Sequence, residues 1–444
     1  MKKKTTKKLL TGLEVEHILL DMDGRISNDS DKIIADCKAH KKDATVVKEC
    51  ATSMVELGAY PSVKVKNTCV DYLDNIQLLI DVAAMHDNLI YPLSVPPLSY
   101  HPKMRHKKWY ALQERLIFGG KSKYEMAGKT AAFHFHYTLP KGIFDWKKRF
   151  PKRLFRSRAA QNMLNSYNLA ISMDPAMVTL MQSSPYLDGR YVAKDTRVLI
   201  QRTGRVFPFQ GIYSTAPKLA GLPIYKHTLT DLLQVIENRH SSVKSLLVKA
   251  GLSPNLVYRY GKILQYSWHS VRVNKIGTME LRSMDVNHPK YVTAATVLLK
   301  FINRAVNLYN YDVIPSDIGI EEPFRIEGEK IYIPPHTHVR KTLQYLSAYE
   351  GFDSKEIYNY SKRFMSMARR FTDKEYYPAV KSLSSIVDRK KTVSDVLIAK
   401  FKKKGFGKKD KIPNDVCSDV MLDSTTRLLK EVYKTRKTVE GLEL

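Results

Sequence analysis

Apolar side chains recur at two different spacings along this chain of 444 residues, and each spacing predicts one kind of element. Strict alternation predicts strands, which we expect at about 12–20, 52–59 and 130–138 and again around Glu280. Apolar positions three and four residues apart predict helices, which we expect at 71–88, 106–118, 157–183, 228–250 and 290–308. Strands and helices are interspersed without regular strand–helix–strand units, which favours an α+β fold over a doubly wound α/β fold.

Other segments lack a long regular apolar period and are expected to form loops or short elements. Residues 94–98 contain two consecutive prolines, and 184–225 is rich in Gly, Pro and Tyr, so both are predicted to be loops. Residues 312–335 are expected to form short strands and turns, and 338–444 to be mostly helical and polar. Gly251 directly follows a predicted helix and is expected to terminate it, because glycine tolerates the left-handed conformation at that position.

The first predicted strand places two glutamates on one face. Successive strand side chains point to opposite faces, so Glu14 and Glu16 lie together while Leu13 and Val15 point the other way. Two neighbouring carboxylates repel unless a positive charge lies between them, and a divalent cation commonly supplies it. Taken alone, the pair would more often be the charged edge of a sheet.

Three further predicted strands carry charged or titratable side chains. Glu280 and Arg282 are two residues apart and would share a face, His134 and His136 are spaced in the same way, and Glu56 is a lone acid between apolar neighbours. Each of these alone is more often a solvent-exposed surface group. Together with the first strand they suit the handling of a nucleoside triphosphate, because Mg²⁺ prefers oxygen ligands and arginine neutralises phosphoryl charge.

Composition indicates a globular protein of a reducing compartment. Hydrophobic residues make up 43% of the chain, but no apolar stretch reaches membrane-spanning length. The four cysteines are far apart and lack metal-finger spacing, which favours free thiols. The N-terminal lysines resemble the start of a signal peptide, but Glu14 and Glu16 interrupt the apolar stretch that should follow. We therefore expect a cytoplasmic protein with no membrane association.

The formal net charge of +29 raises the question of a polyanionic partner. Lysine and arginine cluster in residues 2–8, 147–158 and 400–411. No RNA-binding motif, finger spacing or ladder of alternating basic and aromatic residues accompanies them. A solvated lysine-rich surface is therefore favoured over a nucleic-acid interface. The phosphate-binding loop of P-loop enzymes and the glycine loop of protein kinases are absent as well, so an ATP site would be of another type.

Five short motifs follow one another in order between residues 12 and 300. They are Gly12-Leu13-Glu14-Val15-Glu16, Val55-Glu56-Leu57, Ala132-Phe133-His134-Phe135-His136, Ser183-Ser184-Pro185-Tyr186-Leu187-Asp188-Gly189-Arg190 and Thr278-Met279-Glu280-Leu281-Arg282-Ser283-Met284-Asp285. In this order and spacing, with a segment from Trp268 to Arg272 before the last motif, the chain resembles the glutamate–cysteine ligase type 2 family of carboxylate–amine ligases. The corresponding family patterns are G-x-E-x-E, V-E-L, G-x-H-V-H, S-S-P-x-x-x-G-R and T-x-E-x-R-x-x-D, and Ala132 departs from the third.

The resemblance implies a glutamine-synthetase-like fold, in which a curved, mainly antiparallel sheet forms the active-site face and helices flank it. We expect a disordered basic arm over residues 1–11, the catalytic domain over 12–335, and a helical region over 336–444 that packs on that domain or extends it. The cofactors that the resemblance implies are ATP and Mg²⁺.

The resemblance also implies roles for single residues. Two or three Mg²⁺ ions around the ATP phosphates would be held by Glu14, Glu16, Glu56, His134 and Glu280. Arg282 would stabilise the γ-phosphoryl group as it moves to a substrate carboxylate. Arg190 would pair with a substrate carboxylate or phosphate. Phosphoryl transfer needs positioning and charge neutralisation more than covalent help from the protein, so the lack of a nucleophile triad is no objection.

The resemblance implies an ATP-dependent ligase that joins the γ-carboxylate of glutamate to the amine of cysteine or another amino acid through an acyl phosphate. Such a reaction belongs to glutathione-type biosynthesis, and its partners are small molecules. The alternative is a regulatory or nucleic-acid-associated protein that keeps the ligase fold and uses its basic surface. A third interpretation keeps the chemistry but takes a protein or peptide carboxylate, with the basic clusters docking an acidic partner.

Overall fold

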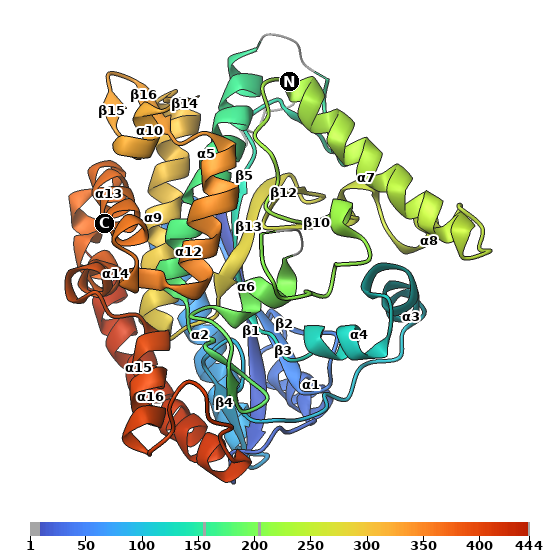
Figure 1. Ribbon diagram of the computed structural model, residues 1–444, viewed down its shortest axis with the longest axis vertical. Coiled ribbons are helices and arrows are strands. Elements are labelled where there is room, and N and C mark those ends of the chain that lie inside the picture. Colours follow the sequence, from blue (N-terminus) through green and yellow to red (C-terminus); the bar gives the residue numbers. More distant parts are fainter. Residues whose placement is uncertain (1–8, 154–156, 203–205, 443–444) are drawn as a thin grey trace.

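A seven-stranded sheet forms the centre of the computed structural model, which describes residues 9–153, 157–202 and 206–442 (Figure 1). The strand order is β12-β13-β5-β1-β3-β2, with β4 paired to the far end of β1, and all of these pairings are antiparallel. The strands are β1 Thr11–Asp21, β2 Val46–Lys48, β3 Met54–Ser62, β4 Asn88–Tyr91, β5 Ala132–Thr138, β12 Val271–Asn274 and β13 Thr278–Asp285. The predicted α+β class and mainly antiparallel sheet are confirmed.

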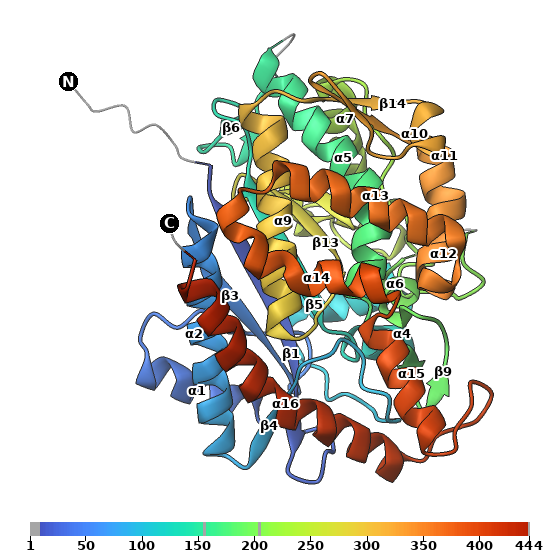
Figure 2. The same cartoon turned by 90° about the vertical axis from the view of Figure 1, so that its left-hand side faces the viewer.

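One face of the sheet is apolar and is covered by three long helices. Leu13 and Val15 of β1 and Phe133 and Phe135 of β5 are at most 2% exposed, because alternation points all four to this face. The covering helices are α2 Val65–Ala84, α5 Arg158–Met181 and α9 Pro289–Leu308. Figure 2 shows α2 and α9 in front of the sheet. Burial of these side chains is the main force that holds the helices on the sheet.

A second layer of helices packs on the first. It contains α12 Gln344–Tyr349, α13 Lys355–Phe371, α14 Tyr377–Arg389, α15 Val393–Lys403 and α16 Asn414–Glu440. Its apolar side chains join the same hydrophobic core as the sheet, which runs from Leu13 to Leu442 (Figure 2). The mostly helical character predicted for 338–444 is confirmed, and the division of the chain at residue 335 stays a prediction.

The polar face of the sheet is overhung by a further group of helices with an apolar cluster of its own, most of them on the right of Figure 1 and α6 near its centre. The group contains α3 Lys108–Gln113, the π-helical turn Glu114–Phe118, α4 Lys121–Ala127, α6 Thr196–Gln201, α7 Leu229–Lys249 and α8 Leu256–Tyr260. The helix α7 ends as predicted. Gly251 has φ +74°, the left-handed conformation that ends a helix. The amides of Gly251 and Leu252 donate to the carbonyls of Val248 and Leu247, which satisfies these carbonyls at the end of the helix.

The remaining elements are short. They are α1 Ser30–His40, β6 Phe144–Asp145, β7 Phe150–Pro151, β8 Tyr186–Leu187, β9 Arg190–Tyr191, β10 Ala220–Gly221, β11 Trp268–His269, β14 Asp312–Pro315, α10 Ile318–Glu321, β15 Ile326–Glu327, β16 Lys330–Ile333 and α11 His336–His338. Among the described residues, no helix combines the length and the apolar character needed to cross a membrane. Of the arm predicted at 1–11, residues 1–8 lie outside the described residues, and Thr11 already belongs to β1.

One predicted helix has different bounds, and α6 is among the helices that were not predicted, with α1 and α4. The helix predicted at 71–88 begins at Val65 and ends at Ala84, and Asn88 belongs to β4. Its first turns contain Asn67 and Thr68, which are poor helix formers, so burial against the sheet and not local propensity places its start. The second miss is α6, which lies within the stretch predicted to be loops. It is only six residues long, and its signal is the N-cap Asp195, whose side chain accepts from Val198.

Candidate active site

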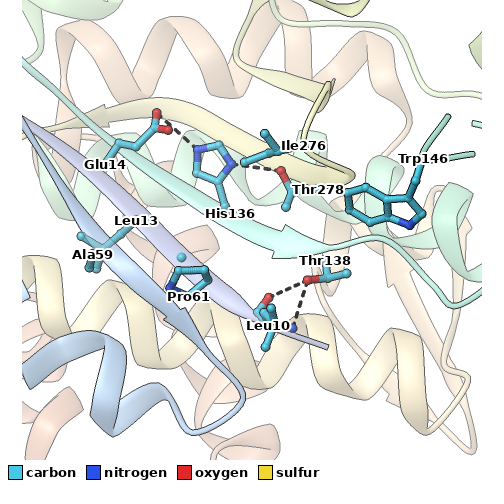
Figure 3. A pocket seen from close by; sticks show the side chains of 11 residues that line it. Leu10, Leu13, Glu14, Ala59, Pro61, His136, Thr138, Trp146, Ile276 and Thr278 are labelled. Carbon is cyan, nitrogen blue, oxygen red and sulfur yellow. Dashed lines mark hydrogen bonds and ion pairs between the residues drawn. The ribbon is translucent and has the colours of Figure 1, made fainter. Parts of the chain in front are cut away.

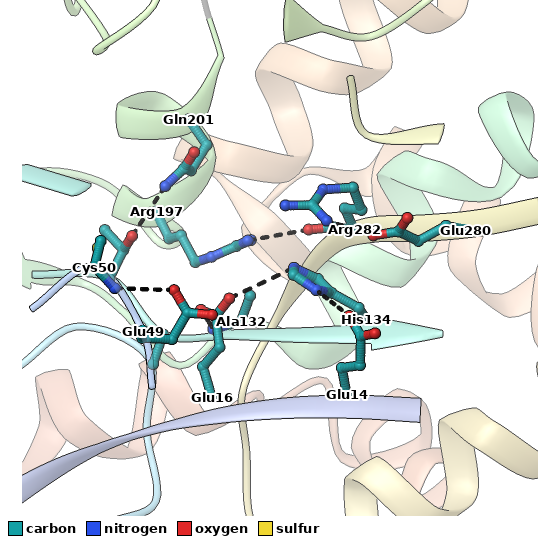
Figure 4. Close-up of polar contacts among 12 residues, drawn as sticks. Glu14, Glu16, Glu49, Cys50, Ala132, His134, Arg197, Gln201, Glu280 and Arg282 are labelled. Carbon is teal, nitrogen blue, oxygen red and sulfur yellow. Dashed lines mark hydrogen bonds and ion pairs between the residues drawn. The ribbon is translucent and has the colours of Figure 1, made fainter. Parts of the chain in front are cut away.

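Four strands bring the predicted site residues together on the polar face of the sheet. Because alternation turns their apolar neighbours to the helices, the charged side chains all point the other way. Cross-strand register then sets which of them meet (Figure 4). The opposed pairs are Glu16–Glu56 between β1 and β3, Glu14–His134 between β1 and β5, and His136–Glu280 between β5 and β13. The strand β1 is thus the centre of the cluster.

The carboxylate end of the cluster consists of Glu16, Glu49 and Glu56, whose oxygen atoms lie within 4.8 Å of one another. Burial and the charge of Glu49 raise the pKa of Glu16 to about 8. Burial also raises the pKa of Glu49, and burial and the charge of Glu49 raise that of Glu56. No lysine or arginine forms an ion pair with these three carboxylates among the described residues. The carboxylate end therefore has no ion-paired cation of its own, and the more distant charges of Arg197 and Arg282 offset the raised pKa of Glu16 only in part.

Glu14 lies in the middle of the cluster, between two histidine rings. Its Oε2 atom is 3.5 Å from His134 Nδ1 and 3.4 Å from His136 Nε2. Burial raises the pKa of Glu14, but the contacts with the two rings outweigh it and hold that pKa below its usual range. Burial and the charge of Arg282 lower the pKa of His134 to about 3, so this ring is neutral at pH 7. A neutral imidazole is the form that binds a metal ion.

The arginine end of the cluster consists of Glu280, Arg272 and Arg282. Arg272 donates to both oxygens of Glu280, from Nε at 2.6 Å and from Nη2 at 3.0 Å. Arg282 donates to Oε1 and Asn274 to Oε2 of the same carboxylate, which is fully buried. Burial raises the pKa of Glu280, but the charges of Arg272 and Arg282 outweigh this effect and hold the pKa well below its usual range. The carboxylate at this end is therefore fully paired.

Arg282 lies in a β-bulge of β13, which sets the direction of its side chain. The pairing of β13 with β5 shifts register between Leu281 and Met284, so Arg282 and Ser283 lie in the irregular part. Arg197 of α6 holds this part from the side, because its Nη1 and Nη2 donate to the carbonyls of Ser283 and Arg282 at 3.1 and 3.0 Å. Arg197 is 5% exposed and lies beside Glu16 and Arg282 in Figure 4. It therefore supports the backbone that carries Arg282.

Arg190 does not join the cluster. It is exposed on the β8–β9 hairpin, and none of its described contacts reaches Glu14, Glu16 or Glu280. The hairpin packs elsewhere, since the carbonyl of Gly189 accepts from the amide of Ile412. The arginines that line a small cavity with Arg282 come instead from α6 and the residue after it, Arg197 and Arg202.

A larger cavity, here called the front cavity, opens beside Glu14 and His136 (Figure 3). Its volume is about 580 Å³, within the range of small-molecule sites. Its walls are mostly apolar, and Glu14 and His136 form its polar end. The Nδ1 atom of His136 lies 3.0 Å from Thr278 Oγ1. The lining residues are Leu10, Gly12, Leu13, Glu14, Ala59, Pro61, His136, Thr138, Trp146, Ile276 and Thr278. A ligand here would have a flat or apolar body beside the charged cluster.

The donor set of the cluster fits divalent metal ions. Besides the carboxylate end, two more groups of three have ligand atoms within 4.8 Å of one another: Glu14, Glu56 and His134, and Glu14, His136 and Glu280. His134 Nδ1 and His136 Nε2 are buried and face Glu14 Oε2 at 3.5 and 3.4 Å, but neither makes a hydrogen bond of good geometry among the described residues. Buried polar atoms without a hydrogen bond are costly, and a cation held between the rings and the neighbouring carboxylates would satisfy them. Glu280 fits less well, because guanidinium groups already engage both of its oxygens.

Three residues of the cluster were given no role from the sequence: Glu49, Arg197 and Arg272, which binds Glu280 from β12. Glu49 lies in the loop between β2 and β3, where no periodic pattern singles out an acid. Arg197 lies in the short helix α6, inside a stretch predicted to be irregular. The nearest sequence signal for Arg197 is the cap Asp195 two residues before it. The predicted residues Glu14, Glu16, Glu56, His134, Glu280 and Arg282 are all brought together by the structure.

Comparison with known proteins finds similarity only in structure. No model of a known protein family and no curated protein sequence matches the chain. A glutamate–cysteine ligase from Francisella tularensis, solved in complex with AMP, is similar with a TM-score of 0.62 and 12% identity over 98% of this chain and 92% of its own. A bifunctional glutathione synthetase from Pasteurella multocida is similar with a TM-score of 0.55 and 16% identity over 96% of this chain.

The chain covers 52% of that glutathione synthetase, so it spans about half of its length. At 12–16% identity these likenesses concern the fold. The resemblance that the sequence motifs indicated is confirmed at this level: the chain has the fold of glutamate–cysteine ligase.

Proposed function

We propose that the protein is an ATP-dependent carboxylate–amine ligase with a glutamine-synthetase-like catalytic sheet. The observation that carries the proposal is the cluster itself: five glutamates and two histidines meet beside Arg282 on a fold similar to glutamate–cysteine ligase. A purely structural role for this cluster is disfavoured, because buried carboxylates with raised pKa values cost folding free energy. Such a cost is typical of functional sites.

The metal ligands in this proposal are mainly those of the carboxylate end and its neighbours. Mg²⁺ would be held by Glu14, Glu16, Glu49, Glu56 and His134, with Glu280 at the margin. When bound, Mg²⁺ would supply positive charge that neutralises the nucleotide phosphates.

The protein side chains have separate tasks around the phosphates. Arg282, held by Glu280 and by the bulge that Arg197 supports, would lie beside the γ-phosphoryl group and stabilise its charge during transfer. The apolar front cavity would hold the nucleoside, since it adjoins the cluster and has Trp146 and Ile276 in its walls. Arg190 is exposed and outside the cluster, so the substrate carboxylate would be positioned by other groups beside Arg282.

The reaction that we propose has two steps. An oxygen of the substrate carboxylate attacks the γ-phosphorus of ATP, the bond to the β–γ bridging oxygen breaks, and ADP leaves an acyl phosphate behind. The amine of the second substrate then attacks the acyl carbon, phosphate leaves with the bonding electrons, and the amine loses a proton to form the amide. We propose the γ-carboxylate of glutamate as the acceptor of the phosphoryl group, and cysteine or another amino acid as the amine.

The test is ADP release by the full chain with Mg²⁺-ATP and glutamate, screened across the amino acids as acceptors. Glu16→Gln and Arg282→Lys should each lower the rate by about 10²–10³-fold or more. Glu321→Gln, an exposed acid on α10, serves as the matched control and should leave the rate unchanged. Activity that survives Glu16→Gln would refute the assigned metal site. Absence of ADP release with every carboxylate and amine tried would count against the ligase itself.

A further inference from the structure

A second cavity lies on the opposite face of the sheet, behind the strands that carry the active site. We call it the back cavity; its volume is about 510 Å³. Tyr137 of β5 lines it, whereas its neighbours His136 and Thr138 line the front cavity, because alternate side chains of a strand point to opposite faces. The other walls come from Leu9, from the start of α2, from α9 and from Asp373 and Tyr376; α2 and α9 lie side by side in Figure 2.

The back cavity contains a buried lysine that no carboxylate pairs with. Lys300 of α9 is 7% exposed, and its Nζ donates to the carbonyl of Val63 at 2.9 Å. The described residues place no carboxylate within ion-pair distance of this ammonium group, which lies 5.7 Å from the centroid of the Tyr137 ring. An ammonium group has three protons to donate, so Lys300 has donors left for a ligand.

Two further buried donors in the same cavity lack partners. The hydroxyl of Tyr137, a side chain that is 1% exposed, has no hydrogen-bond partner among the described residues, and neither has Nε of Arg304. Both Nη atoms of Arg304 are taken by Asp373, with Nη1 at 2.7 Å from Oδ2. Buried donors are rarely left unsatisfied, so these atoms are available to an acceptor, a water or a ligand, that enters the cavity.

The start of α2 adds to the positive potential of the back cavity. Val63, Lys64 and Val65 line the cavity, and α2 begins at Val65 with no side chain capping its first amides. A helix of 20 residues carries partial positive charge at its N-terminus and favours anions there. With Lys300 and Arg304 against the single carboxylate of Asp373, the lining has an excess of positive charge.

We propose that the back cavity is a binding site for a small organic carboxylate. The carboxylate group would accept from Lys300 and from the hydroxyl of Tyr137, in front of the N-terminus of α2. The apolar body would lie against Leu9, Val65 and Phe301, which make most of the remaining lining apolar. A volume of this size suits a molecule larger than a simple inorganic anion. The site is separate from the proposed ligase activity, and neither depends on the other.

The test uses phenylacetate as the probe, with the full chain and saturation-transfer NMR followed by titration calorimetry. Phenylacetate should bind saturably, and phenylacetamide, which keeps the ring but lacks the charge, should bind at least about tenfold more weakly. Lys300→Met keeps the length of the side chain and removes its charge, so it should weaken the binding of phenylacetate by about tenfold or more. Tyr137→Phe should weaken it by about three- to tenfold without lowering Tm, because the hydroxyl has no partner to lose.

The matched control is Lys290→Met on the same helix, since Lys290 pairs with Glu431 away from the cavity and its loss should leave binding unchanged. Equal binding of phenylacetate and phenylacetamide would overturn the proposal. So would wild-type affinity in a folded Lys300→Met variant, or absence of saturable binding. Displacement of phenylacetate by ADP would place the probe in the front cavity and would overturn the assignment in the same way.

Discussion

The two ends of the candidate active site contain the same acid in opposite electrostatic states. At the arginine end, Glu280 is fully buried, two guanidinium groups bind it, and its pKa is held low. At the carboxylate end, Glu16 and Glu56 are half-buried near another carboxylate, and burial together with the charge of Glu49 raises their pKa values. The arginine end is complete without a ligand, whereas the carboxylate end is stable only when protons or cations are bound. Removing a carboxylate should therefore have opposite effects on stability at the two ends.

Glu280→Gln should have the largest effect. Both Arg272 and Arg282 would face a neutral partner in a buried place, so we expect the free energy of unfolding to fall by about 3–5 kcal/mol. ADP release should fall by about 10³-fold, because Arg282 loses the group that aims it. Urea denaturation and the ligase assay measure the two effects. Unchanged stability would show that the arginines do not depend on Glu280.

Glu16→Gln should stabilise the metal-free protein while abolishing activity. The folded-state pKa of Glu16 is about 8, above the ordinary value of 4.5, so the folded protein binds the extra proton between these values. The stability from this group is complete below about pH 4.5 and is lost as pH rises through 8. Glutamine does not ionise, so the variant loses no stability in this way. Its free energy of unfolding should exceed that of the wild type by a few kcal/mol at pH 8.5 and by little at pH 5.

Calorimetric Tm values in EDTA at several pH values check this comparison. Glu237→Gln, an acid that pairs with Arg153 on the surface, is the control and should show no rising advantage with pH. A Glu16→Gln variant that is less stable than wild type at pH 8.5 would contradict the picture of an uncompensated carboxylate end.

Mg²⁺ should stabilise the wild-type protein by an intermediate amount. A ligand that binds only the folded state at about ten times its Kd adds about 1.4 kcal/mol. The gain should be larger at pH 8 than at pH 6, because protons compete for Glu16 and Glu56. Thermal scans with and without Mg²⁺ measure it, and the double variant Glu16→Gln with Glu56→Gln should lose most of the gain. An equal gain in the double variant would place Mg²⁺ elsewhere.

Arg190→Ala should have the smallest effect, within about twofold of the wild-type kcat/KM for the carboxylate substrate, because the side chain is exposed and outside the cluster. Arg197→Lys offers the contrast. Lysine lacks the planar guanidinium group with which Arg197 donates to the carbonyls of Ser283 and Arg282. The bulge would therefore shift, and kcat/KM should fall by about tenfold or more. A large loss in Arg190→Ala would restore the role that its motif predicts.

Most elements with a strong apolar period could be predicted from the sequence, and so could the site residues on β1, β3, β5 and β13. Glu14 and Glu16 could be predicted because alternation in β1 fixes their common face. Glu49 could not, because a loop residue has no period and reaches the site only through the pairing of β2 with β3. Nor could the bidentate contact of Arg272 with Glu280, since neither residue reveals which strand will lie beside its own.

The placement of β1 at the centre of the sheet has a consequence for folding. Glu14 and Glu16 alternate with Leu13 and Val15, so a slip of one residue in the pairing of β1 with β3 or β5 would turn both acids toward α2 and α9. It would also turn two core side chains toward water. Burying two unpaired carboxylates costs several kcal/mol each, more than a marginally stable fold can tolerate. The residues proposed for catalysis thus also disfavour pairing of β1 in the wrong register. The register that buries Leu13 and Val15 is the one that places Glu14 and Glu16 in the active site.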